Sequence, residues 1–251
     1  MTRSDQTRGT HETSTDPECP DLHEVACEQC KLHGFLALFT EMGVESHSIF
    51  LSRRRPVAKG TLLIDVGLPF DGIYAIKSGS FKSYSLAEQS GEQILGFFLP
   101  GELIGLDAMR SGSYGYSVMA LEASTVCWMP LKGLDALGDQ KTRFQEEVIR
   151  ILVDQVQHDQ RQTLLMGRRT AEERLGAFLL NLAGRYQRHG FNGEAFRLPM
   201  LQIDIANYLG LSMETVSRTL RSFREQELLT IQGKKLRILN ADCLRSIAQY
   251  C

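Results

Sequence analysis

The sequence predicts an α+β protein in which an antiparallel β-roll, a long helix and a winged helix-turn-helix follow one another along 251 residues. Three patterns predict this order: β-rich runs between glycines in residues 49–137, an amphipathic helical period in 138–167, and two short helical patterns before a hairpin in 168–242. Regularly spaced short strands with glycine turns are typical of a small antiparallel roll. An N-terminal segment, 1–48, and a C-terminal tail, 243–251, complete the expected domain organisation.

The composition is that of a soluble globular protein with two cores. Hydrophobic residues make up 43% and charged residues 23% of the chain, which are ordinary values for such proteins, and the length is sufficient for two domains. No apolar run approaches the roughly 20 residues of a membrane span. The first 18 residues are polar and acidic and lack the apolar core of a secretory signal. We therefore expect a cytoplasmic location and no membrane partner.

The charge is distributed unevenly between the two halves. The overall formal charge is only −2. Residues 168–251 hold 13 Lys and Arg against 8 Asp and Glu, a net charge of +5, whereas residues 1–167 hold 15 against 22, a net charge of −7. A basic C-terminal domain beside an acidic N-terminal one indicates a nucleic-acid-binding module attached to a domain with another task.

Six short β-rich runs predict the strands of the roll. Glycines punctuate them, as expected where the chain turns tightly. The candidate strands are Thr61–Val66, Gly72–Ile76, Ser80–Ser85, Gln93–Phe98, Ser117–Leu121 and Thr125–Met129.

Three of the six cysteines, Cys19, Cys27 and Cys30, lie within twelve residues of one another near the N-terminus. In a cytoplasmic protein such a cluster favours a metal site over disulfides. A fourth, Cys127, lies on a candidate strand, where a lone cysteine also fits a buried apolar position. The two cysteines without neighbours in sequence are Cys243 and Cys251.

A long helix from Phe144 to about Leu165 is predicted to form a dimer interface. One stripe recurs at spacings of four, four, three and four, narrow enough for a two-stranded seam. Its members are Val148, Leu152, Val156, Asp159 and Thr163. Asp159 either meets its own copy across the twofold axis and opposes pairing, or lies on a solvated face. The stripe predicts a homodimer controlled by Leu152, Val156 and Asp159.

The next helix begins with a capping box formed by Thr170 and Glu173 and ends near Gly190. A helix-turn-helix motif follows at residues 202–221. Gly210 ends its first helix, and Ser212 is placed to cap the second. The residues expected to face the core are Ile203, Ile205, Ala206 and Leu209 on the first helix and Val216, Leu220 and Phe223 on the second.

Glu214, Ser217 and Arg218 are spaced to share the outer face of the second helix. In this motif the start of the second helix reads the major groove, where Arg contacts guanine, Glu contacts cytosine and Ser contacts either partner. The alternative is a solvated face with an ordinary Glu–Arg pair. Because the turn, the cap and the following hairpin agree, we favour double-stranded DNA as partner. In the turn of that hairpin, Lys234 and Lys235 are placed to meet phosphates.

Several stretches give the chain a resemblance to a known family. They are Tyr74–Gly79, Gly91–Ile94, Pro100–Gly105, Ala171–Leu175, Asn207–Leu211 and the Glu-Thr-Val-Ser-Arg stretch of residues 214–218. From about Cys27 to Ile247 the chain resembles the Crp/Fnr family of bacterial transcription regulators, especially its oxygen-sensing branch. The resemblance implies a cyclic-nucleotide-binding-like roll, no enzymatic activity, a homodimer on palindromes of TTGAT half-sites, contact with RNA polymerase and activation of anaerobic genes.

The same resemblance implies an iron–sulfur cluster, of the 4Fe–4S type, held by Cys19, Cys27, Cys30 and Cys127. This chain departs from the usual C-x2-C-x5-C spacing, because Cys19 precedes the close pair by seven intervening residues. His33 is the alternative fourth donor. Zinc is the competing metal, since a C-x2-C pair and two further thiolates also suit a tetrahedral site.

Other functions are either disfavoured by the sequence or stay open. Cyclic-AMP-binding members carry an Arg-Ser pair where this chain has Ser117-Val118, and Arg110 lies several residues early, so a ligand phosphate would lack a cation. A thiol–disulfide enzyme needs its C-x-x-C at the start of a helix in a βαβ unit, which this sequence lacks. A thiol redox site or a small-ligand effector in place of the cluster stays open.

Overall fold

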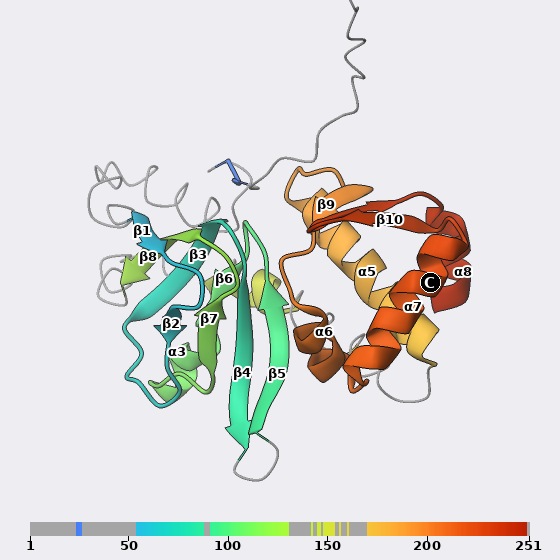
Figure 1. Ribbon diagram of the computed structural model, residues 1–251. Helices are drawn as coiled ribbons and strands as arrows, with labels where there is room; N and C mark the ends of the chain where they lie inside the picture. Colours follow the sequence, from blue (N-terminus) through green and yellow to red (C-terminus); the bar gives the residue numbers. More distant parts are fainter. Residues whose placement is uncertain are drawn as a thin grey trace, which may run out of the picture.

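The computed structural model describes residues 24–26, 54–87, 91–130 and 170–249, together with residues 142, 145, 146, 148–153, 156 and 160, which are helical. Figure 1 shows a β-roll on one side and a mainly helical C-terminal domain on the other, with strands β4 and β5 facing the C-terminal domain. The fold class predicted from the sequence is confirmed. No helix in these described ranges is long and apolar enough to cross a membrane.

The roll consists of two four-stranded antiparallel sheets, with strand orders β1-β8-β3-β6 and β2-β7-β4-β5. Each of the six predicted runs overlaps a strand, and β1 and β6 are additional. The strands are β1 (Arg54–Val57), β2 (Leu62–Ile64), β3 (Gly72–Ser78), β4 (Phe81–Ala87), β5 (Gly91–Phe98), β6 (Leu103–Ile104), β7 (Ser117–Ala120) and β8 (Ser124–Pro130), with a short helix α3 (Ala108–Ser111) before β7. Between the sheets, Ile64, Ile76, Phe81 and Val126 are almost fully buried and form the roll core.

The C-terminal domain follows the predicted winged helix-turn-helix. Its elements are α5 (Ala171–Arg188), β9 (Ala195–Arg197), α6 (Gln202–Leu209), α7 (Met213–Glu225), β10 (Leu229–Gln232), β11 (Lys235–Ile238) and α8 (Ala241–Ala248). The capping box at the start of α5 is present, since Thr170 accepts from the Glu173 amide and Glu173 accepts from the Thr170 amide. Gly210 has a φ of 62° between α6 and α7, a left-handed conformation that glycine adopts at little cost.

Two features of this domain differ from the expectation. Ile203 was predicted to face the core, but it is 59% exposed, and its neighbour Asp204 is buried instead. The buried carboxylate is accommodated because Lys82 of the roll pairs with it at 2.9 Å. The segment expected as a tail from residue 243 onwards contains most of α8, whose Leu244 and Ala248 are fully buried.

The roll and the C-terminal domain share one apolar core. Phe97 of β5 makes edge contacts with Phe178 of α5 and Tyr208 of α6, with ring centroids 5.9 and 5.1 Å apart. At Gly101, with a φ of 90°, an added Cβ would lie 2.4 Å from the imidazole of His189. This close approach of the β5–β6 turn to the end of α5 requires glycine, so the two domains are closely packed.

Candidate functional site

The candidate nucleic-acid interface is the outer face of α7. Ser212 caps this helix by accepting a hydrogen bond from the Thr215 amide at 3.1 Å, which satisfies one of the free amides at its start. Val216, Leu220 and Phe223 are buried, as predicted, and fix the inner face against the domain core. The orientation of α7 therefore follows from its cap and from three apolar anchors.

Glu214, Ser217 and Arg218 are all exposed on α7, so the structure brings the three predicted reading residues onto one accessible face. Arg221 continues this face, and sequence reasoning missed it. It lies seven residues after Glu214 and three after Arg218, which is the spacing that signals a shared helix face. Its guanidinium is exposed and pairs with Glu225 at 2.8 Å.

The wing is the antiparallel hairpin of β10 and β11, extended by β9 on the other side of β11. The two lysines of the wing are less exposed than the sequence predicts. Lys234 is half-buried, and its ammonium donates to the Pro199 carbonyl at 3.3 Å. Lys235 is also half-buried, in register with Arg197 of β9. The tip between the strands is formed by Gly233, whose φ is 60°.

The candidate metal ligands are described only in part. Cys127 is half-buried on β8, where it is in register with Ala75 of β3. Cys19, Cys27 and Cys30 lie outside the described residues. No group of three metal-binding side chains occurs among the residues that the structure describes.

The chain just before Cys27 is nevertheless fixed to the roll. Val25 is fully buried and donates from its amide to the Lys77 carbonyl of β3 at 2.9 Å. Glu24 pairs with the Lys77 ammonium at 3.4 Å. Because β3 is the strand next to β8, the segment leading to Cys27 is attached beside the strand that carries Cys127. This arrangement fits a site that draws ligands from both segments.

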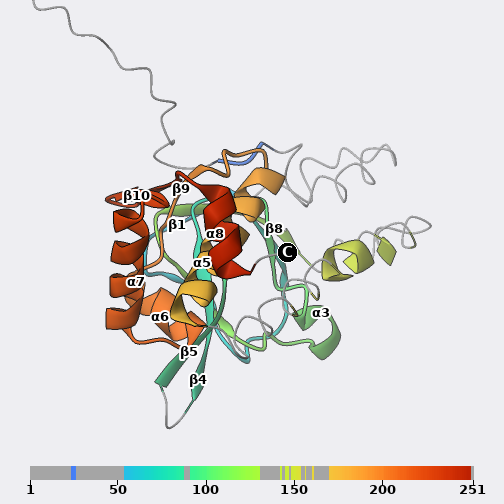
Figure 2. The ribbon, with the colours of Figure 1, turned by 90° about the vertical axis from the view of Figure 1, so that its right-hand side faces the viewer.

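The described residues between 142 and 160 are helical, and Figure 2 shows them on the opposite side of the molecule from α7. Val148 is partly buried against the roll core, together with the fully packed Ile151. Among the described residues of this helix, the exposed large apolar side chains are Ile149, Leu152, Val153 and Val156. Leu152 and Val156 are therefore exposed, as the predicted dimer interface requires. Val148 does not belong to the exposed stripe, because it packs against the roll. Asp159 lies outside the described residues.

The residues that stand where cyclic-AMP-binding members carry an Arg-Ser pair supply no cation. Ser117 donates to Asp65 at 2.8 Å and accepts from the Val66 amide at 3.1 Å. Arg110, the cation that the sequence offered, is exposed on α3. Because Asp65 lies beside Ser117 and would repel a phosphate, this position does not offer the cationic partner that an Arg-Ser pair supplies.

Comparisons with known proteins agree with both domains. Residues 54–141 match the cyclic nucleotide-binding domain, and residues 173–247 match the Crp-like helix-turn-helix domain. The chain is 38% identical over 228 residues to the fumarate and nitrate reduction regulatory proteins of Salmonella typhimurium and of Escherichia coli K12. These alignments cover 90% of this chain and 91% of each relative.

Solved structures show the same architecture. FixK2 from Bradyrhizobium japonicum superposes with a TM-score of 0.70 at 26% identity, covering 78% of this chain and 96% of FixK2. TTHB099, a regulator of the CRP family from Thermus thermophilus, superposes with a TM-score of 0.62 at 18% identity, covering 78% and 97%. The chain belongs to the Crp/Fnr family of DNA-binding transcription regulators and is similar to the fumarate and nitrate reduction regulatory proteins over nearly its whole length.

Proposed function

We propose that this regulator is a homodimer that binds palindromic DNA made of TTGAT half-sites and senses oxygen or redox state through an iron–sulfur cluster. In this proposal it acts in the cytoplasm and contacts RNA polymerase to activate anaerobic genes. Its relatives are named for the regulation of fumarate and nitrate reduction. The observation that carries the DNA part of the proposal is the exposed face of Glu214, Ser217 and Arg218 on a capped and anchored α7.

The dimer part of the proposal rests on the helix between residues 142 and 160. Ile149, Leu152, Val153 and Val156 follow the i, i+3, i+4, i+7 spacing of one helix face, and all four are exposed. Four apolar side chains in one exposed stripe are typical of an interface with another chain. A parallel pairing of two such helices would present two recognition helices to the two halves of a palindrome.

The sensor part assigns four thiolates, Cys19, Cys27, Cys30 and Cys127, as ligands. When bound, a cluster held by such thiolates supplies an oxygen-sensitive redox centre. Support comes from the attachment of Glu24 and Val25 beside β3, which directs the segment that leads to Cys27 to the part of the roll that carries Cys127.

Replacing each assigned ligand with serine tests the sensor. Cys19→Ser, Cys27→Ser, Cys30→Ser and Cys127→Ser should each abolish oxygen-labile iron and anaerobic binding to the palindrome together. Cys243→Ser is the matched control, because Cys243 is exposed on α8 in the DNA-binding domain. A Cys19→Ser protein with a full cluster would show that the ligand assignment is wrong and would make His33 the candidate fourth ligand.

A further inference from the structure

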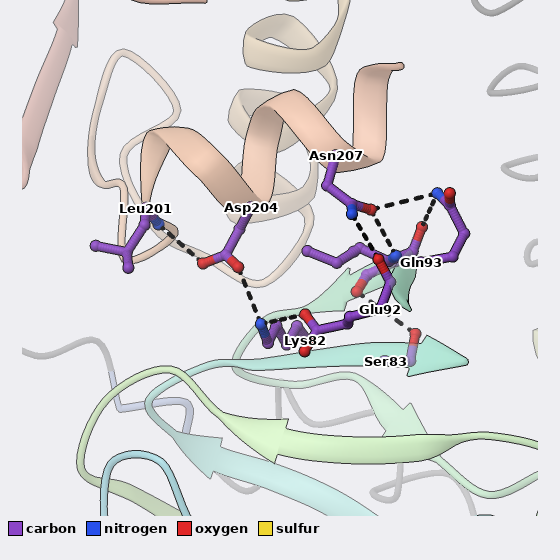
Figure 3. A network of polar contacts seen from close by, with 9 residues as sticks. Lys82, Ser83, Glu92, Gln93, Leu201, Asp204 and Asn207 are labelled. Atoms are coloured by element: carbon purple, nitrogen blue, oxygen red, sulfur yellow. Dashed lines mark hydrogen bonds and ion pairs between the residues drawn. The ribbon is translucent and has the colours of Figure 1, made fainter. Parts of the chain in front are cut away.

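Helix α6, the first helix of the motif, is attached to an edge strand of the roll through Asn207. The Asn207 amide nitrogen donates to the Glu92 carbonyl, and its amide oxygen accepts from the Ile94 amide, each at 2.7 Å (Figure 3). These are the two kinds of bond that a neighbouring strand would make with an exposed sheet edge. Since β5 is the last strand in the order β2-β7-β4-β5, the side chain occupies that edge.

A buried ion-pair network lies beside this contact. Lys82 of β4 places its ammonium 2.9 Å from Asp204 of α6 and also pairs with Glu92 of β5 (Figure 3). The Asp204 carboxylate also accepts a hydrogen bond from the Leu201 amide at 3.2 Å and so helps to cap the start of α6. Burial alone would lower the pKa of Lys82, but the two carboxylates outweigh it and raise that pKa, which keeps the ammonium charged.

A second group of contacts closes the interface at α5. Arg185 is buried, donates to Glu102 at 2.8 Å and also binds the Phe97 carbonyl. Arg197 of β9 donates to Glu122 at 2.8 Å. Two domains of one chain usually move relative to each other unless the interface between them is large and hydrophobic. Here the apolar core of Phe97 is continuous across the interface, so the C-terminal domain is held to the roll as one unit.

In this arrangement the interface positions α7 and leaves it accessible. Helix α6 packs directly against α7 through the short turn at Gly210. Glu214, Ser217 and Arg218 stay exposed while Asn207 and Asp204 are engaged with the roll. Contact with the roll and contact with DNA therefore use different faces of the motif and are compatible.

We propose that Asn207 and Lys82 are positioning residues for DNA recognition, which fix each recognition helix relative to its own roll. This inference rests on the proposed dimer and palindrome. If both rolls are joined through the helix between residues 142 and 160, the two fixed recognition helices stand at one set separation. Two rigidly linked modules engage two sites more strongly than loosely linked ones. The dimer then binds most tightly to half-sites at that separation.

The test measures how strongly the protein prefers one spacing of the half-sites over another. A variant that only lowers the stability of the domain would not change this preference. One added base pair moves a half-site by about 3.4 Å and turns it by about a tenth of a helical turn. The test compares three duplexes: two TTGAT half-sites at the separation that the wild type binds most tightly, the same with one base pair inserted, and one half-site beside random sequence. Affinities are measured by fluorescence anisotropy on anaerobically purified protein.

Asn207→Ala should reduce the preference for the correct spacing over the inserted base pair by about tenfold. Its affinity for the single half-site should stay within about twofold of the wild type. Lys82→Met, which keeps most of the apolar stem, should act in the same direction. The control is Asn240→Ala, which removes the cap that accepts from the Cys243 amide at 3.0 Å and lowers stability of the same domain without touching the roll. Its spacing preference should equal that of the wild type.

Three results would overturn the inference. Equal losses on all three duplexes would show that Asn207 acts only through the stability of the winged helix. An unchanged spacing preference would show that the roll does not set the separation. Tighter binding of the palindrome by the variant would make the contact inhibitory. A wild-type protein that binds the palindrome no better than a random duplex would contradict the proposed function itself, and the inference with it.

Discussion

Arg218 and Arg185 show how position decides the role of the same side chain. Arg218 is exposed on α7, where its planar guanidinium is available to a guanine edge. Arg185 is only 6% exposed and is fully engaged with Glu102 and the Phe97 carbonyl. The first arginine is suited to recognising a partner, and the second to holding two domains together.

Replacing Arg218 with alanine should weaken binding of the specific DNA site by roughly 1–3 kcal/mol. Binding of random duplex should change little, because charge contacts with phosphates dominate it. Competition binding with both duplexes measures the difference. Arg245→Ala is the control, since Arg245 is an exposed arginine on α8 that pairs with Asp242. Equal losses on specific and random DNA would assign Arg218 to a phosphate.

Replacing Glu102 with glutamine should remove a pH-dependent part of the stability. Burial raises the pKa of this carboxyl, but Arg185 outweighs it, and the pKa falls to about 2 from an ordinary 4.5. A lowered pKa stabilises the fold above about pH 4.5, and this stabilisation is lost as the pH falls towards 2. At neutral pH the variant leaves Arg185 buried without its carboxylate, which costs roughly 3–5 kcal/mol.

Urea unfolding at a series of pH values measures this effect. The difference in the free energy of unfolding between wild type and Glu102→Gln should shrink as the pH falls below about 4.5. Glu225→Gln is the matched control, because Glu225 also pairs with an arginine but on an exposed surface. A constant difference at every pH would show that Glu102 does not titrate as described.

At the scale of elements, local signals predicted most of what was found. Three helix-end features could be predicted from the sequence because each acts within four residues. They are the capping box of Thr170 and Glu173, the N-cap at Ser212 and the left-handed Gly210. The burial of Asp204 could not be predicted from the sequence. Its partner, Lys82, lies 122 residues away in the sequence, and periodicity favoured Ile203 as the inward residue.

The long helix was predicted as an element, but its packing was only partly predicted. Val148 was placed in the seam because its spacing from Leu152 fits, whereas the roll covers Val148 and Ile151 in the structure. A periodic pattern shows that two apolar faces exist but not which neighbour covers each. The extra helix α8 was missed because its buried residues, Leu244 and Ala248, form too short a stripe to be recognised.

Two substitutions in this helix should shift the oligomeric state in opposite directions. Leu152→Lys places a charge in the exposed apolar stripe and should move the protein towards monomer. If Asp159 meets its own copy across the twofold axis, Asp159→Ala should move the cluster-free protein towards dimer, because a like-charge contact is removed. Sedimentation of the two variants and the wild type measures both shifts. An unchanged monomer fraction in Asp159→Ala would place that carboxylate on a solvated face.

At the scale of the whole molecule, an acidic N-terminal part of the chain is joined to a basic DNA-binding domain, and the roll packs against that domain through a buried interface. Residues 1–167 hold a net charge of −7 and residues 168–251 one of +5. The positive charge of the second domain is available to DNA, while ion pairs such as Lys82–Asp204 bind the two domains to each other. Helix α6 contacts β4 and β5 of the roll and packs against α7, so we expect a signal received at the roll to reach α7 through α6.

Anaerobic purification, followed by iron, sulfide and zinc analysis and by DNA binding before and after exposure to air, tests the oxygen-sensing proposal most directly. We predict iron and sulfide in equal amounts and little zinc. The palindrome should bind to the anaerobic protein and dissociate after exposure to air as the iron is lost. Stoichiometric zinc without iron, or unchanged palindrome binding after complete loss of iron, would contradict the proposal.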